Sequence, residues 1–188
     1  MLFLSKINSW IVLKGGGIFI SEKIYSEVKP GKKRFKTALA KIILFFLGRG
    51  FKVCASMDSR IKHEVGCLDD GMTIMMRVDP NGPCMAVRKI SGKLEYIGSS
   101  CLDDADMSIY FKNIEAAILV LTGQIGIAQA YAEHRFTLKG DIALGMSVVR
   151  CMNIIEAYLF PKFISRKILK KVPEKEVSTA RIYISIIF

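Results

Sequence analysis

The sequence predicts an α+β fold, in which a meander of short strands precedes a largely helical half. Four β-prone runs lie at residues 72–78, 84–90, 93–97 and 106–111. The run Asp-Pro-Asn-Gly-Pro at residues 79–83 is a concentrated turn signal, and Ser91 and Gly92 suit a two-residue hairpin. Connections this short favour a sheet that is at least partly antiparallel.

Apolar residues ahead of the strands repeat at helical spacing. They stand three or four residues apart, at Phe35, Leu39, Ile42, Ile43, Phe46 and Leu47. This pattern predicts a helix over residues 35–47 that ends at Gly48, and Asp58 is expected to cap a short helix that closes at Gly66. The apolar stripe favours packing against the sheet, and a surface helix lying on lipid is the alternative that stays open.

Helical periodicity dominates from residue 113 onward. The expected elements are helices over residues 114–121, 124–133, 142–149 and 152–169, with Pro161 interrupting the last, and a strand over residues 135–139. Asn113 and Asp141 are the expected N-caps of the first and third of these helices. The β-prone apolar run at residues 182–188 is expected either to be disordered or to add to a sheet edge.

The composition favours a lipid or membrane partner and no nucleic acid. Of the 188 residues, 51% are hydrophobic, and the formal net charge is +11. The charge is concentrated at residues 29–41 and 162–175, beside apolar helical stretches. Binding to nucleic acid would require basic residues interleaved with exposed aromatic residues. An anionic membrane surface is therefore the favoured charged partner, and a basic surface with no specific partner is the alternative.

Cysteine use and the N-terminal sequence indicate a reducing, cytoplasmic setting. Five cysteines are present without a C-x-x-C pair, and they are expected to be small core residues. Residues 1–20 lack the basic start and the small-residue cleavage site of a secretory signal. The most apolar stretch, residues 38–47, is too short for a bilayer-spanning helix. We expect a cytoplasmic protein, and peripheral contact with the inner membrane surface stays open.

The sequence contains no arrangement of residues that catalysis requires. His63 and His134 lie in charged local sequence and belong to no zinc-binding pattern. The aspartate pairs at residues 69–70 and 103–104 would bind a cation only if the fold brought them together, and two solvated turns are the favoured interpretation. We therefore expect a protein that is not an enzyme and that requires no metal and no cofactor.

Residues 105–146 contain a series of short motifs. They are Ala-Asp-Met-Ser-Ile at 105–109, Leu-Val-Leu-Thr-Gly at 119–123, Ala-Gln-Ala-Tyr at 128–131, Phe-Thr-Leu-Lys-Gly-Asp at 136–141 and Ile-Ala-Leu-Gly-Met at 142–146. In their order and spacing they resemble the closing half of the sterol carrier protein type 2 family. The strands expected over residues 72–97 suit the first half of the same domain, so the resemblance extends over residues 35–152.

The resemblance implies a mixed, largely antiparallel five-stranded sheet with helices covering one face and an apolar tunnel between the two layers. The expected lining residues are Ile118, Leu121, Ile125, Tyr131, Phe136, Leu138, Met146 and Val149, and Gln124 is the expected head-group contact. Residues 35–160 would form the lipid-binding domain, between an N-terminal extension (1–34) and a basic C-terminal extension (161–188).

Two functions follow from the resemblance. The first is non-catalytic binding of a fatty acyl, phospholipid or isoprenoid lipid, with lipid transfer as its extension. The alternative is an accessory protein that presents a lipid, such as a quinone precursor, to partner enzymes. Both are compatible with a partner protein or a homo-oligomer. The segment after Cys151, with Tyr158, Leu159 and Phe160, is expected either to roof the tunnel or to fill it.

Overall fold

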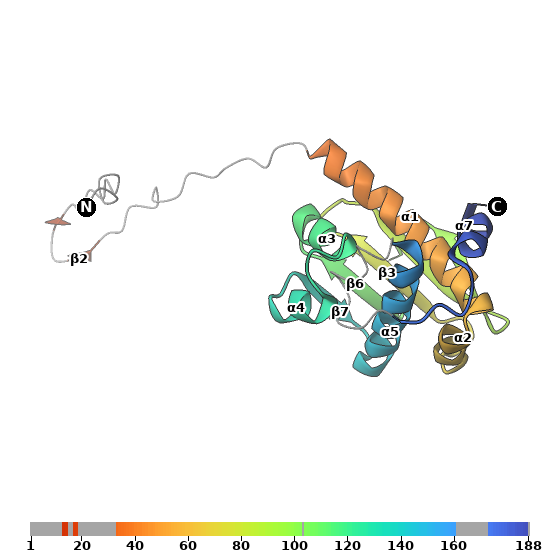
Figure 1. The fold of residues 1–188 in the computed structure, drawn as a ribbon. Helices are drawn as coiled ribbons and strands as arrows, with labels where there is room; N and C mark the ends of the chain where they lie inside the picture. The colour runs from red at the N-terminus through yellow and green to blue at the C-terminus, as the bar shows by residue number, and fades with distance from the viewer. Residues whose placement is uncertain (1–12, 15–16, 19–32, 103, 161–172, 188) are drawn as a thin grey trace. The chain divides into compact units, whose positions relative to one another are not determined.

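The computed structural model describes residues 13–14, 17–18, 33–102, 104–160 and 173–187 (Figure 1). The chain forms two units, Met1–Lys32 and Lys33–Phe188. In the first unit, β1 (Leu13–Lys14) and β2 (Gly17–Ile18) pair as antiparallel strands. The second unit contains the five-stranded sheet and the helices, and all candidate functional residues lie in it.

The second unit begins with two helices and then follows the predicted order of strands and helices. Its elements are α1 (Arg34–Met57), α2 (Ser59–Gly66), β3 (Thr73–Val78), β4 (Cys84–Ile90), β5 (Lys93–Gly98), β6 (Met107–Phe111), α3 (Ile114–Leu121), α4 (Ile127–Ala132), β7 (Phe136–Lys139), α5 (Ile142–Leu159) and α7 (Thr179–Ile187). Asp58, Asn113 and Asp141 cap α2, α3 and α5 through their side chains, so the three predicted N-caps are confirmed.

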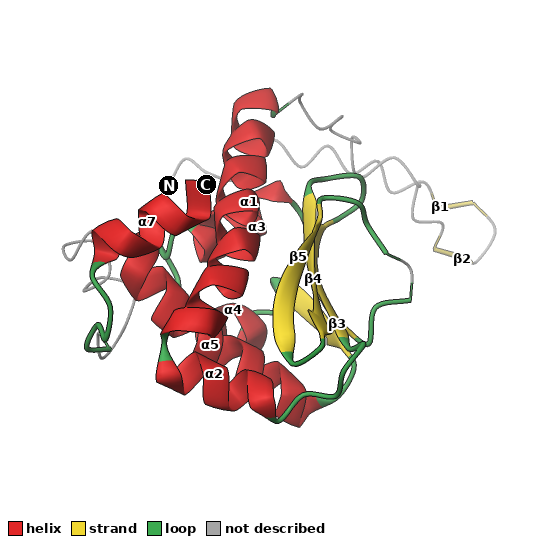
Figure 2. Ribbon diagram, turned by 90° about the vertical axis from the view of Figure 1, so that its right-hand side faces the viewer, coloured by secondary structure: helices red, strands yellow, loops and turns green. Residues whose placement is uncertain are grey.

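The sheet has the strand order β5-β4-β3-β6-β7. Its central strand β3 pairs with β4 in the antiparallel sense and with β6 in the parallel sense, so that Met76 stands opposite Met85 and Ile109. The outer pairs, β4 with β5 and β6 with β7, are antiparallel. Figure 2 shows the helices on one side of this sheet. The predicted α+β class, with a mixed five-stranded sheet and one helix-covered face, is confirmed.

The main core lies between the helices and one face of the sheet. Buried side chains on that face come from every strand and include Ile74, Met76, Val78, Met85, Val87, Leu94, Met107, Ile109, Phe111 and Phe136. On β3, β4 and β6 they are two residues apart, as the pleat of a strand requires. A smaller cluster on the opposite face joins Met75 and Ala86 to Ala105 and Leu102 in the segment before β6.

The predicted end of the first helix at Gly48 is wrong, because α1 continues to Met57. Gly48 and Gly50 are buried where α1 packs most closely on its neighbours. A Cβ atom on Gly48 would lie 2.6 Å from the ring of Tyr96 in β5, and one on Gly50 would lie 2.9 Å from Ile155 in α5. These glycines therefore allow close packing of the helix and do not terminate it.

Three further predictions are corrected at the C-terminal side. Residues 142–149 and 152–159 form one continuous helix, α5, which ends as Phe160 adopts the extended conformation favoured before a proline. The helix expected over residues 124–133 is shorter and is α4. The run at residues 182–187 belongs to a helix, α7, since Ile182 and Ile186 are buried four residues apart. Residues 161–169 of the expected helix, and residue 188, lie outside the described residues.

We predict that Gly48→Ala destabilises the protein by about 1–3 kcal/mol, because the added methyl group overpacks the contact between α1 and Tyr96. Urea unfolding monitored by circular dichroism measures the change. Gly66→Ala at the end of α2 is the matched control, because a Cβ there meets nothing within 4 Å. The control is expected to be neutral or slightly stabilising. Equal effects of the two substitutions would contradict the packing role of Gly48.

Candidate functional site

The nine predicted lipid-contacting residues lie in α3, α4, β7, the first half of α5 and the intervening turns. Leu121 and Phe136 are buried in the core at 2% and 4% exposure. Ile118, Ile125, Leu138 and Val149 are partly buried, and the first three pack against the core. The structure therefore places Leu121 and Phe136 as core residues and the other four at the boundary between the core and the surface.

The remaining predicted residues lie at the surface. Tyr131 and Met146 are each 54% exposed. Gln124 is also exposed, and its Nε2 donates a hydrogen bond to the hydroxyl of Thr122 over 2.9 Å. Because this bond is local and the side chain stays in solvent, nothing in the geometry directs Gln124 toward the core.

Two contacts place Tyr131 beside Phe136 and Leu138 beside α5. The rings of Tyr131 and Phe136 lie 5.6 Å apart, measured between their centroids. Leu138 packs on α5 at Gly145, where a Cβ atom would lie 2.5 Å from a Leu138 methyl carbon. Met146 follows Gly145 directly in α5. We refer to Ile118, Ile125, Tyr131, Leu138, Met146 and Val149 as the α3–α5 apolar surface.

The expected tunnel between the helices and the sheet is not shown by the described residues. A cavity of about 10 Å³ lies in this layer among Phe51, Leu68, Ile74, Val148 and Cys151. A cavity of roughly 10–15 Å³ is the minimum that holds one water molecule. At this place the layer is therefore closed by side chains, and an acyl chain would require them to move.

The segment after Cys151 is expected from the sequence either to roof the tunnel or to fill it. The structure instead places Tyr158, in this segment, in a buried polar cluster. It is 1% exposed, and its hydroxyl donates a hydrogen bond to Asp58 Oδ2 over 2.9 Å. Arg60 binds the same carboxylate through Nε and Nη2, at 3.1 and 2.7 Å. Burial of Asp58 alone would raise the pKa of its carboxyl group, but the hydrogen bonds from Arg60 and Tyr158 outweigh this and hold the pKa below its usual value.

This polar cluster also binds the chain that leads into α7. The Tyr158 hydroxyl accepts hydrogen bonds from the backbone N–H groups of Glu176 and Val177, at 2.9 and 3.3 Å. The Glu176 carboxylate in turn accepts bonds from the backbone N–H and the hydroxyl of Ser59, at 2.8 and 2.7 Å. The α1–α2 corner, α5 and the C-terminal segment are therefore joined at Asp58.

The cysteines are only partly the core residues that the sequence predicts. Cys54, Cys84 and Cys151 are buried, whereas Cys67 and Cys101 are exposed. Burial raises the pKa of each of the three buried thiols to about 12, which makes them poor nucleophiles. His63 and His134 lie at the surface. Across the described ranges, no group of three or more histidine, cysteine, aspartate or glutamate residues is placed to hold a metal ion.

The two aspartate pairs lie in turns. The structure describes three of these four residues. Asp70 accepts a hydrogen bond from the backbone N–H of Gly92 over 3.0 Å, at the β4–β5 hairpin. Asp69 and Asp104 are exposed, and Asp103 lies outside the described residues. Asp70 thus has a structural role in the hairpin.

One described helix is long and apolar enough to span a bilayer by length and composition. It is α5, and half of it is buried within the domain. A core helix of a globular protein has the same properties. The packing of α5 against α1, α2 and α7 accounts for its hydrophobicity.

Glu156 is a buried carboxylic acid that the sequence analysis missed. It is 5% exposed, and the described part of the chain provides no hydrogen-bond or ionic partner for its carboxyl group. Burial raises its pKa to about 8. In α5 it follows Met146, Val149 and Asn153 at spacings of three and four, so it shares their side of the helix. A single acid within the apolar run Ile-Ile-Glu-Ala was the available sequence signal.

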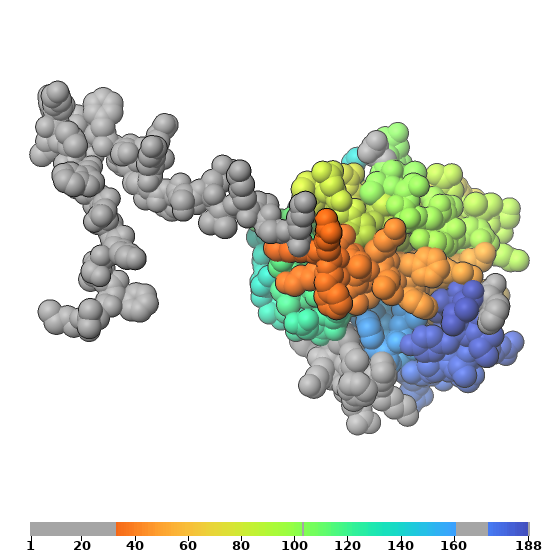
Figure 3. All heavy atoms as spheres, turned by 90° about the horizontal axis from the view of Figure 1, so that it is seen from above, coloured from red at the N-terminus to blue at the C-terminus, as the bar shows by residue number. Residues whose placement is uncertain are grey.

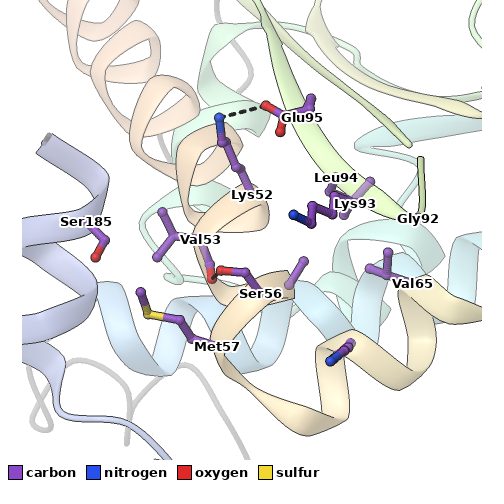
Figure 4. Close-up of a pocket in the computed structure, with 12 residues that line it drawn as sticks. Lys52, Val53, Ser56, Met57, Val65, Gly92, Lys93, Leu94, Glu95 and Ser185 are labelled. Atoms are coloured by element: carbon purple, nitrogen blue, oxygen red, sulfur yellow. Dashed lines mark hydrogen bonds and ion pairs between the residues drawn. The ribbon is translucent and has the colours of Figure 1, made fainter. Parts of the chain in front are cut away.

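A pocket of about 280 Å³ is a second feature that the sequence did not reveal (Figure 4). It lies between the second half of α1, α2, the start of the edge strand β5, and α7. Its apolar walls include Val53, Val65 and Leu94, and Lys52, Lys62 and Lys93 also line it. These lysines come from three elements with no regular spacing in the chain, so no local pattern could have identified the pocket.

Comparison with known proteins finds similarity in the structure only. No family model matches the chain, and no curated protein matches it. Among solved structures, a UbiJ-SCP2 ubiquinone synthesis protein is 15% identical, with 65% of this chain and 99% of that chain covered and a TM-score of 0.43. Apo sterol carrier protein 2 from Yarrowia lipolytica is 12% identical, with 60% and 89% covered and a TM-score of 0.43.

A sterol carrier protein domain 2 from Helicoverpa armigera gives a similar result. It is 15% identical, with 69% of this chain and 94% of that chain covered and a TM-score of 0.41. The resemblance to sterol carrier proteins that the motifs predict is thus found in the comparison of structures as well. The similarity to these structures is one of fold alone.

We predict that Glu156→Gln makes the protein more stable than the wild type at alkaline pH. The folded state holds the Glu156 proton up to about pH 8, whereas an unfolded glutamate releases it near pH 4.3. The wild type therefore has its full stability below about pH 4.3 and loses a few kcal/mol as the pH rises from there to about 8, above which the loss is complete. Glutamine has no proton to lose and removes this dependence.

Urea unfolding at pH 6 and pH 9 measures the effect of this substitution. Glu133→Gln is the control, because Glu133 is exposed and hydrogen bonds from Gln129 and Arg135 lower the pKa of its carboxyl group. An advantage of the Glu156 variant that does not grow between the two pH values would refute the buried, unpaired state of this acid.

Proposed function

We propose that the protein is a non-catalytic lipid-binding protein and that the lipid chain lies on the α3–α5 apolar surface. The observation that supports this most directly is the exposure of large apolar side chains within one short stretch. Tyr131 and Met146 are 54% exposed and Ile142 is 72% exposed. Ile142 and Met146 stand one helical turn apart on α5, and contiguous exposed apolar area often marks a ligand or partner surface.

The chemistry of this surface suits an acyl or isoprenoid chain. Its members are aliphatic or aromatic, and Ile118, Ile125 and Leu138 already pack on the core with part of their area exposed. Covering such area is favourable by roughly 25 cal/mol for each Å² removed from water. An apolar contact without directed polar groups selects weakly between chain lengths, because one methylene group changes the affinity little.

We also propose that the protein reaches its lipid at an anionic membrane surface through α1. Phe35, Ile42 and Phe45 are 81%, 54% and 41% exposed, and their spacing places them on one side of the helix. Figure 3 shows α1, in orange, exposed along the face of the second unit seen from above. Exposed basic residues, Arg34 and Lys41, accompany this stripe, and Arg49 lies over the Phe45 ring at 5.8 Å.

Apolar and basic residues on one exposed helix are the features of a helix that lies on anionic lipid. This location, at the cytoplasmic membrane surface, remains part of the proposal. The accessory role beside quinone-synthesising enzymes remains a prediction from the sequence. A partner protein and a homo-oligomer likewise remain predictions from the sequence.

We predict that the double variant Tyr131→Gln/Met146→Gln loses most of its bound lipid while remaining folded, because both side chains are largely exposed. Native mass spectrometry after incubation with labelled farnesol, an uncharged isoprenoid, measures the bound fraction. Ile90→Gln is the matched control, since Ile90 is 47% exposed on β4, outside this surface. A wild-type protein that shows only its unliganded mass, or a variant that retains its lipid, would refute the proposal.

We predict that Phe35→Ser/Ile42→Ser weakens binding to phosphatidylglycerol vesicles by about tenfold or more, since each apolar side chain contributes roughly 1.5–3 kcal/mol when buried. Vesicle flotation measures binding, which is expected to decrease as salt rises and to be weak on phosphatidylcholine. Ile184→Ser in α7 is the control, because Ile184 is 60% exposed on another helix. Binding that is unaffected by salt and by anionic lipid would contradict the role of α1.

A further inference from the structure

The pocket between α1, α2, β5 and α7 combines an apolar wall with an excess of positive charge. Val53, Val65 and Leu94 are 7%, 4% and 2% exposed, so they form a firm apolar wall. The volume of about 280 Å³ is close to the lower end of the range of roughly 300–1,000 Å³ for small-ligand pockets.

The lysines at this pocket are only partly neutralised. Among the lining residues the carboxylate is Glu95, and Lys52 already binds it over 2.7 Å. Asp70 lies next to the pocket at Gly92, but its carboxylate accepts the Gly92 N–H and lies 3.8 Å from Lys89 Nζ. Lys62 and Lys93 have no carboxylate partner in the described part of the chain. Two uncompensated ammonium groups therefore border the pocket.

The arrangement of the side chains separates the charged and apolar parts. Figure 4 shows Lys93 extending from β5 toward α1, with Leu94 and Val65 beside it and Val53 opposite. Ser56 does not offer a free donor to a ligand, because its hydroxyl donates to Val53 O over 2.7 Å. Lysine stems pack along apolar surface while the ammonium group stays at the water boundary.

We propose that this pocket binds an anionic amphiphile, with the apolar chain against Val53, Val65 and Leu94 and a carboxylate or phosphate head group between Lys62 and Lys93. The charge is complementary to such a head group, and the mostly apolar wall excludes a free inorganic anion as the main ligand. Lysine binds either head group as a point charge. This site is separate from the α3–α5 apolar surface and does not depend on the proposed function.

The test uses the full-length protein and calorimetric titration with dodecanoate and dodecyl phosphate below their aggregation concentrations. Dodecanol supplies the chain without the charge, and inorganic phosphate supplies the charge without the chain. The anionic amphiphiles are expected to bind at least about tenfold more tightly than dodecanol, and phosphate alone is expected not to bind. Dodecanol that binds as tightly as dodecanoate, or phosphate that binds alone, would overturn the proposal.

Two variants locate the site. Lys62→Gln/Lys93→Gln is expected to weaken dodecanoate binding about tenfold, while Lys112→Gln/Lys139→Gln, with the same change of charge at exposed positions near β7, leaves it unchanged. Ser56→Phe at an exposed lining position is expected to block the pocket without disturbing the core. Equal affinities in the two lysine pairs, or unchanged binding to Ser56→Phe, would refute the site.

A third variant separates this proposal from the lipid surface. Tyr131→Gln/Met146→Gln is expected to bind dodecanoate as the wild type does. If that variant loses dodecanoate and the Lys62/Lys93 variant keeps it, the ligand lies on the α3–α5 apolar surface, so that the pocket is refuted and the lipid-binding function is supported. If both variants keep it, the pocket is refuted, and the lipid-binding function is decided by its own experiment.

Discussion

The buried carboxylate of Asp58 is the interaction on which the helical layer depends. It is 0% exposed and lies between α1 and α2, where it caps α2 and binds Arg60 and Tyr158. A buried charge without partners is costly, and one with several directed hydrogen bonds fixes the groups around it. Because Tyr158 in turn binds the backbone before α7, one acid joins the α1–α2 corner, the end of α5 and the segment that leads into the C-terminal helix.

Features of the fold determined by neighbouring residues could be predicted from the sequence. The caps at Asn113 and Asp141 were predictable because each side chain binds backbone N–H groups two or three residues away. The continuation of α1 through Gly48 was not, since it depends on the ring of Tyr96, which lies far along the chain. In α7, isoleucines with β propensity form a helix because Ile182 and Ile186 are buried together.

The candidate site was predictable to a smaller extent. The motifs around residues 105–146 identified the elements that form the α3–α5 apolar surface, but Leu121 and Phe136, two of the predicted lining residues, are core residues. Periodicity shows which side of a helix is apolar. It does not show whether another side chain already covers that side. The lysine pocket could not be predicted, because Lys52, Lys62 and Lys93 meet only through tertiary packing.

The central position of β3 has a consequence for the order in which the sheet assembles. Met76 reaches Met85 across a short turn, but it reaches Ile109 only after the β4–β5 hairpin and the following segment have been traversed. Closing the longer loop costs more chain entropy. The antiparallel meander of β3, β4 and β5 is therefore expected to form first. The strands β6 and β7 then pair with a sheet that has already formed. The half of the domain that carries the α3–α5 apolar surface is thus the later half to form.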